Sequence, residues 1–66
     1  MHITVNGEAT QVDNAASISS LIEQLGLGAR RIAIERNGEI VPRSAHAQAR
    51  LVEGDAIEIV HALGGG

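Results

Sequence analysis

The chemistry that this sequence could carry is concentrated in its last four residues, Leu63-Gly64-Gly65-Gly66. Glycine has no Cβ, so a run of glycines can pass through a narrow channel in another protein. A C-terminal carboxyl group has an ordinary pKa of about 3.3–3.7, so it is ionised at neutral pH and is a poor acyl donor. It reacts after activation, most simply by transfer of AMP from ATP. We therefore expect the carboxyl group of Gly66 to be the reactive group, and Gly64 and Gly65 to form the tail that enters partner active sites.

A frayed end or a linker remnant is the alternative interpretation of the three glycines. The preceding run, Ala56 to His61, alternates apolar and polar side chains, which predicts a strand. A glycine tail directly after a strand favours the reactive interpretation.

Composition excludes several classes of function. The chain has 66 residues, no cysteine and no aromatic residue, and its net charge is −3. A domain of this size buries only about 60% of its unfolded surface. Disulfides, thiolate metal sites and base-stacking surfaces are therefore not available, and the negative charge argues against a nucleic-acid partner. All five basic residues are arginine.

The sequence also lacks the features of a membrane protein. No apolar run approaches the roughly 20 residues of a transmembrane helix, and the start has no signal-peptide pattern. We expect a cytoplasmic chain without a membrane partner.

No group of side chains suggests a catalytic or metal site. His2, His46 and His61 do not have the spacing of metal ligands, and we interpret them as structural or surface residues. No serine, histidine and aspartate grouping suggests a nucleophile with its base. We therefore predict no catalytic residue, no metal and no bound cofactor.

Two groups of residues near the tail could contact a partner. Glu53, Asp55 and Glu58 form an acidic cluster, which is either a solvated turn or a docking patch for a basic surface. If Ile57 and Ile59 face the core, the alternation of a strand places other side chains on the outer face. The residues predicted to dock are Glu58, Val60, Ala62 and Leu63.

The first half of the chain predicts a hairpin and a helix. Met1–Val5 alternates as a half-buried strand, Asn6-Gly7 is a type I′ turn signal, and Glu8–Val12 is an edge strand. The helix spans Ser17–Leu25, with Ser17 as its N-cap and a capping box that is incomplete because Ser20 stands in place of Glu or Gln. Its apolar face contains Ile18, Leu21, Ile22 and Leu25, and Gly26 is suited to the C′ position.

The second half predicts three more strands. These are Arg31–Arg36, a short strand Glu39–Val41 that Pro42 ends, and Ala56–His61. Asn37-Gly38 is a second tight-turn signal. The segment Ser44 to Arg50 is compatible with one helical turn or with irregular edge structure.

This order of elements predicts an α+β fold, a β-grasp with a mixed sheet and one helix packed across one face. We expect Met1–Val5 and Ile57–His61 at the sheet centre, and the strand after the helix parallel to a strand of the first hairpin. We expect residues 1–63 to form a single domain and residues 64–66 to form a flexible C-terminal glycine tail.

Three segments of the sequence carry a resemblance to a known family. Glu39-Ile40-Val41-Pro42-Arg43-Ser44, Glu53-Gly54-Asp55 and Glu58 to Gly66 resemble the ThiS family, the sulfur carrier proteins of thiamin biosynthesis. The resemblance covers the whole chain, including its length and the Leu-Gly-Leu-Gly end of the helix. The terminal Gly-Gly is shared by all ubiquitin-like carriers.

The resemblance implies a ubiquitin-like β-grasp and a role as carrier rather than enzyme. An adenylating enzyme related to ubiquitin-activating enzymes would use ATP to activate Gly66. A sulfur-donor system, a cysteine desulfurase or its equivalent, would then convert the carboxylate to a thiocarboxylate. Thiazole synthase would accept the sulfur while it builds the thiazole ring.

Three alternatives remain open at the level of sequence. The first is a sulfur carrier of the molybdopterin pathway, which is usually longer and richer in aromatic residues. The second is a ubiquitin-like protein modifier that joins Gly66 to lysines of target proteins. The third is an interaction module with an inert tail.

Overall fold

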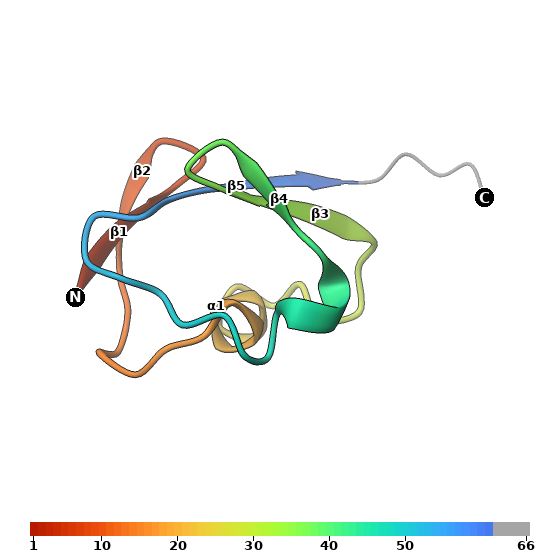
Figure 1. Ribbon diagram of the computed structural model, residues 1–66, viewed down its shortest axis with the longest axis horizontal. Coiled ribbons are helices and arrows are strands. Elements are labelled where there is room, and N and C mark those ends of the chain that lie inside the picture. The colour runs from red at the N-terminus through yellow and green to blue at the C-terminus, as the bar shows by residue number, and fades with distance from the viewer. Residues whose placement is uncertain (62–66) are drawn as a thin grey trace.

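The computed structural model describes residues 1–61 of the chain, and residues 62–66 lie outside the described residues. The elements follow the order that the sequence predicts (Figure 1). They are β1 (His2–Val5), β2 (Glu8–Gln11), α1 (Ile18–Gln24), β3 (Ile32–Arg36), β4 (Glu39–Val41), the 3₁₀ turn η1 (Arg43–Ala45) and β5 (Ala56–His61). The ambiguous segment from Ser44 to Arg50 contains part of η1, further turns and a single bridge between Arg50 and Ser17.

The five strands form one mixed sheet in the order β2-β1-β5-β3-β4. β5 is the middle strand, and it pairs in parallel with β1 and antiparallel with β3. The predicted central strands and the predicted edge position of β2 are confirmed. β3, the strand after the helix, runs in the same direction as β2, as the crossover rule predicts, but β1 and β5 lie between them. The two neighbouring strands that pair in parallel are therefore β1 and β5.

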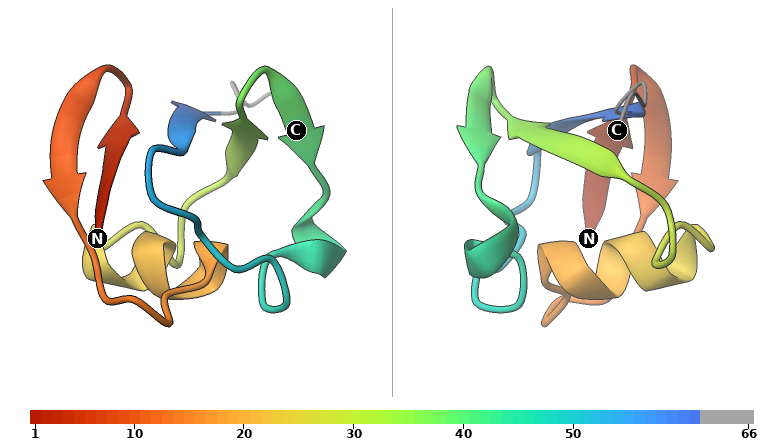
Figure 2. Two further views of the ribbon diagram at one scale, coloured as in Figure 1. Left: turned by 60° about the vertical axis from the view of Figure 1, so that its left-hand side comes forward. Right: turned by 90° about the vertical axis from the view of Figure 1, so that its right-hand side faces the viewer.

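Helix α1 lies across one face of the sheet and closes a purely aliphatic core (Figure 2). Ile18 and Leu21 of the helix are fully buried together with Ile34 and Ile57 of the sheet. The α+β β-grasp arrangement of the prediction is confirmed. Leu25 was predicted on the apolar face but is 38% exposed, because it is the C-cap residue, where the chain leaves the helix.

Both ends of the helix are satisfied by local hydrogen bonds. The hydroxyl of Ser17 accepts from the N–H of Ser20 at 3.1 Å, and the hydroxyl of Ser20 accepts from the N–H of Ser17 at 2.8 Å. The capping box is therefore complete, contrary to our expectation, since a serine at this position reaches the N-cap backbone as a glutamate would. Gly26 has φ +72°, and the N–H groups of Gly26 and Leu27 bond carbonyls of the last turn, as in a Schellman motif.

The two Asn-Gly turns have a second role besides reversing the chain. Asn6 and Asn37 both have φ 51°, and a glycine with positive φ follows each, as type I′ turns require. The side-chain oxygen of Asn6 accepts from the N–H of Ile59 at 2.8 Å, and its amide donates to the Ile59 carbonyl at 3.3 Å. The side-chain oxygen of Asn37 accepts from the N–H of Ala56 at 2.9 Å. Side chains of both turns thus bond the middle strand.

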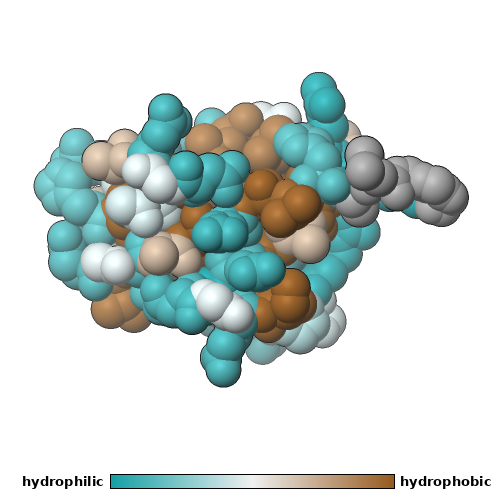
Figure 3. Space-filling model, turned by 90° about the horizontal axis from the view of Figure 1, so that it is seen from above, coloured by the Kyte–Doolittle hydropathy of each residue, from teal (hydrophilic) through white to brown (hydrophobic). Residues whose placement is uncertain are grey.

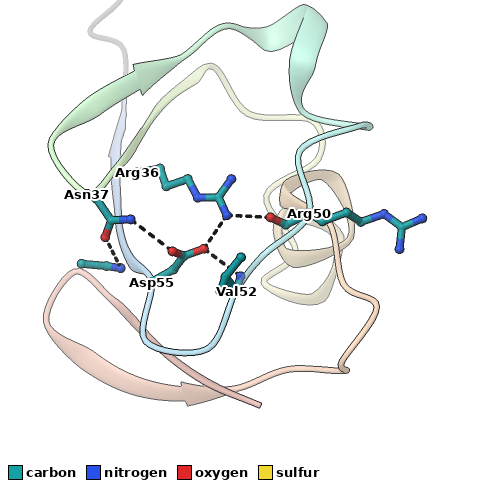
Figure 4. Close-up of polar contacts among 6 residues, drawn as sticks. Arg36, Asn37, Arg50, Val52 and Asp55 are labelled. Carbon is teal, nitrogen blue, oxygen red and sulfur yellow. Dashed lines mark hydrogen bonds and ion pairs between the residues drawn. The ribbon is translucent and has the colours of Figure 1, made fainter.

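A buried carboxylate fixes the turn that leads into β5 (Figure 4). Asp55 is 6% exposed, and its Oδ2 lies 2.8 Å from Nη2 of Arg36 and accepts from the N–H of Val52 at 2.8 Å. Its Oδ1 accepts from the amide of Asn37 at 3.1 Å, and Nη2 of Arg36 also donates to the Arg50 carbonyl at 2.7 Å. Burial by itself would raise the pKa of Asp55, but the hydrogen bonds from Val52, Asn37 and Arg36, with the charge of Arg36, outweigh it and lower the pKa.

We predict that Asp55→Asn lowers the free energy of unfolding at neutral pH by about 2–3 kcal/mol, less than for a fully buried ion pair because the Arg36 side chain is 25% exposed. The folded-state pKa is depressed, so the stabilisation by Asp55 is fully present above its ordinary pKa of 3.8. It is lost as the pH falls through the depressed folded-state pKa. Urea unfolding of both proteins as a function of pH measures this difference. Asp13→Asn, at an exposed position, is the control, and an equal loss in that variant would contradict the assignment.

We predict that Asn6→Gly destabilises the fold by about 1–2 kcal/mol, because glycine retains the positive φ but removes both hydrogen bonds to Ile59. The amide of Ile59 should lose its protection against hydrogen exchange, whereas the amide of Ile57, on the same strand, should change with global stability alone. Native-state exchange by NMR separates the two amides. Unchanged relative protection of Ile59 would show that the Asn6 side chain does not hold this part of β5.

Candidate functional site

The alternation along β5 divides its side chains between the core and the outer face of the sheet. Ile57 and Ile59 are buried beneath the sheet. Glu58 and Val60 point to the opposite face, where Val60 is 52% exposed. The predicted orientation of these four residues is confirmed, and the docking role of Glu58 and Val60 stays a prediction.

Neighbouring strands extend this exposed surface. The register places Ala33 of β3 opposite Val60, and Glu35 of β3 opposite both Glu58 of β5 and Ile40 of β4. Directly paired residues point to the same face of a sheet. These residues therefore share one surface, which we call the outer-face patch: Ala33, Glu35, Ile40, Glu58 and Val60.

Ile40 is the residue of this patch that sequence reasoning missed. It is 63% exposed, more than any other large apolar residue that the structure describes. Its neighbour Val41 is opposite the buried Ile34, which forces Ile40 outward. Figure 3, viewed onto the outer face of the sheet, has apolar surface beside the grey end of the chain, bordered by hydrophilic groups. The outward direction of Ile40 follows from the pairing of β4 with β3. A strand of only three residues is too short for its own sequence to show which side chains face outward.

Two carboxylates face each other within the patch. Glu35 and Glu58 are directly opposite on antiparallel strands, and Glu58 is exposed. Like charges in this position destabilise a sheet by a few tenths of a kcal/mol. A cationic group of a partner would remove that repulsion on binding, so the patch combines apolar contact area with a preference for basic side chains.

The acidic cluster of the sequence is divided by the fold. Asp55 is buried with Arg36 and is not available to a partner. Glu53 lies in the turn before β5, where it accepts from the N–H of His2 at 2.9 Å. Glu58 alone belongs to the outer-face patch, so the cluster of three is not one docking surface.

The histidines have separate surroundings. His2 lies 3.9 Å from Glu53 at the beginning of β1, whereas His61 is the last residue of β5; the parallel register places them at opposite ends of the sheet. His46 is buried, and its Nε2 lies 3.0 Å from the Val41 carbonyl. Within residues 1–61 no group of three or more potential ligands is placed to hold a metal ion. No helix in the described part is long and apolar enough to cross a membrane.

The other predicted site residues lie outside the described residues. They are Ala62 and Leu63 of the predicted docking surface, Gly64 and Gly65 of the tail, and the reactive Gly66. β5 ends at His61, which pairs with Ile32 at the start of β3. The outer-face patch therefore includes two residues, Glu58 and Val60, of the strand that leads into these residues.

Comparisons with known proteins agree on one family. The model of the ThiS family matches residues 3–66 of the chain. The sulfur carrier protein ThiS of Bacillus subtilis is 34% identical over 53 residues, which are 80% of each chain. The crystal structure of the thiamine biosynthesis protein ThiS of Geobacter metallireducens superimposes with a TM-score of 0.85 at 33% identity over the whole of both chains.

A further relative is much longer. A thiazole synthase of Paramagnetospirillum magneticum is 41% identical over 66 residues, the whole of this chain. The chain spans about a fifth of the length of that protein.

The family match covers nearly the whole chain, and the solved ThiS structure has the same ubiquitin-like β-grasp with a mixed sheet and one helix. The chain therefore belongs to the ThiS family, the sulfur carrier proteins of thiamin biosynthesis.

Proposed function

We propose that the chain carries sulfur as a thiocarboxylate on Gly66. A carboxylate oxygen of Gly66 attacks the α-phosphorus of ATP on an adenylating enzyme of the ubiquitin-activating type, and pyrophosphate leaves. The terminal sulfur of a persulfide, formed from cysteine by a desulfurase, then attacks the acyl carbon of Gly66 and displaces AMP. A thiol reduces the resulting acyl disulfide, which releases the thiocarboxylate and leaves a disulfide on the donor side. The observation that carries this proposal is that the family match extends through residue 66 and so includes the glycine tail.

In this reaction the chain is a co-substrate and not a catalyst. ATP is bound and consumed by the activating partner, and the chain itself needs no cofactor. All five of its basic residues are arginine, and it has no cysteine. A side-chain amine or thiol, which would compete for the activated acyl group within the carrier, is thus absent from the sequence. We place the exchange in the cytoplasm, where ATP and cysteine are both available.

Thiazole synthase is the proposed acceptor of the sulfur. Two proteins named thiazole synthase contain a segment similar to this whole chain, at 41% and 36% identity. A carrier-like segment in the same polypeptide as a synthase favours direct transfer between the two. We propose that Glu58, Val60, Ala62 and Leu63 contact the partners while Gly64 and Gly65 enter their active sites.

The covalent change at Gly66 can be followed by intact mass. Incubation with ATP, the adenylating enzyme and the sulfur-donor system should change the intact mass by replacement of one oxygen with sulfur. Deletion of Gly65 and Gly66 should abolish this change and leave the circular dichroism spectrum unaltered. Addition of the chain to other proteins would instead support a protein modifier. No mass change with a competent adenylating enzyme would contradict both functions.

Serine substitutions test the docking role of the outer-face patch. Val60→Ser and Ile40→Ser should each raise the KM of the adenylating enzyme for the carrier about fivefold, because each removes an exposed apolar contact, whereas kcat stays constant. Val52→Ser is the matched control, since Val52 is similarly exposed but lies in the loop before β5. An equal effect of Val52→Ser would show that the patch is not the docking surface.

A further inference from the structure

A pocket lies on the helix side of the sheet, on the face opposite the outer-face patch. Its volume is about 230 Å³, and it is an open pocket lined by residues of α1, the loop after it, the start of β3 and the turn that contains η1. Apolar walls come from Ile22, Leu27 and Ile32, and the polar residues include Arg30 and Arg43.

Backbone hydrogen bonds hold the walls of this pocket in place. The N–H of Arg30 donates to the Leu27 carbonyl at 3.0 Å, which closes the loop after the helix. The His46 carbonyl accepts from the N–H of Ser19 at 3.1 Å, which joins the turn after η1 to the helix. The His46 ring is in turn fixed by the contact of its Nε2 with Val41. The pocket is therefore a built feature of the fold and not a gap between loose loops.

The pocket is locally basic in an acidic protein. Arg30 and Arg43 contribute two positive charges, and Glu23 contributes one negative charge to the same lining. Within residues 1–61 the hydrogen bonds and ion pairs of the structure engage the side chains of Arg36 and Arg50 but not those of Arg30 and Arg43. Two guanidinium groups at an open pocket are suited to a carboxylate or phosphate group.

The position of the pocket favours a side-chain carboxylate of a partner protein over a free phosphate. Ile32, in its wall, is directly opposite His61, the last residue of β5. Neighbouring strands lie about 4.8 Å apart. In Figure 1, η1 and the loop after α1 lie at the end of the molecule toward which β5 runs. A protein that takes the residues after His61 into its active site must therefore cover this end and face the pocket.

We propose that the pocket receives the carboxylate of an aspartate or glutamate side chain of the adenylating enzyme. This inference rests on the proposed function, because it takes that enzyme as the protein that receives the tail. The enzyme then meets opposite charges on the two faces of the carrier: the carboxylates of the outer-face patch and the guanidinium groups of the pocket. Complementary charges fix the register of a complex more than its affinity. The two faces together set the rotation of the carrier about β5, which a glycine tail alone cannot do.

Kinetics with matched charge changes test the proposal. Arg43→Glu should raise the KM of the adenylating enzyme for the full-length carrier about tenfold at low salt, with kcat unchanged, because the reacting Gly66 is intact. Arg31→Glu makes the same change in net charge at an exposed arginine next to Arg30 that is not part of the pocket lining, and its KM should change less than twofold. Equal effects of the two variants would overturn the proposal, since they would reflect net charge alone.

Cross-linking identifies the group in the pocket. The chain has no lysine, so Arg43→Lys introduces a single side-chain amine that a zero-length carbodiimide can join to a carboxylate in contact with it. We expect a cross-link to an aspartate or glutamate of the adenylating enzyme, located by mass spectrometry and at least fivefold more abundant than with Arg31→Lys. Equal yields from the two variants would contradict the proposal.

Two further measurements separate this inference from the proposed function and from a small-molecule site. The first is the intact mass of the wild-type carrier: if no thiocarboxylate forms, the proposed function fails. The cross-link can be measured in the complex without ATP, so it still supports or contradicts the pocket contact in that case. Titration of the free carrier with inorganic phosphate, followed by NMR, should give no saturable shifts at Gly28 or His46. Saturable binding that Arg43→Glu abolishes would overturn the proposal in favour of a site for small anions.

Discussion

The placement of β5 is the constraint on which the rest of the structure depends. Its parallel ladder with β1 covers two residue pairs, from Thr4 and Val5, after which β1 ends in a turn. The side chain of Asn6 then replaces the missing backbone partner with a donor and an acceptor for Ile59. On the other side, Asn37 bonds the first residue of the strand. The direction in which β5 leaves the sheet is thus fixed by two turns that lie far from it in the sequence.

The polar network lies just before β5, and the candidate site extends along β5 itself. Asp55, just before β5, is buried and satisfied by Arg36, Asn37 and Val52. Within the strand, β5 carries Glu58 opposite Glu35, a pair that opposes folding. A small aliphatic core supplies little surplus stability, so a repulsive pair near the site needs compensation elsewhere in the fold. The buried carboxylate at the start of the strand is suited to that role.

The limits of the sequence-based predictions follow from the distance between interacting residues. Patterns within a few residues, such as the Asn-Gly turns, the alternation of β5 and the glycine after α1, predicted the elements and the faces correctly. The burial of Asp55 and the outward direction of Ile40 depend on partners from other elements, and no local pattern contains them. Two of the five residues of the outer-face patch, those on β5, were therefore predicted from the sequence, and the three on β3 and β4 were not. The tail residues stay predictions, because they lie outside the described residues.

If the chain acts as the proposed carrier, its partners must recognise it by its surface, because the chemistry of a glycine tail is the same for every carrier that uses one. Discrimination therefore has to come from the folded residues around the end of β5. Here an apolar and acidic face and a basic pocket lie on opposite sides of the sheet. A partner with the reverse arrangement of charges would meet repulsion on both faces, although the tail could still reach its active site. Two surfaces of opposite charge therefore discriminate between partners better than one larger surface of a single charge. They do so without enlarging a 66-residue fold.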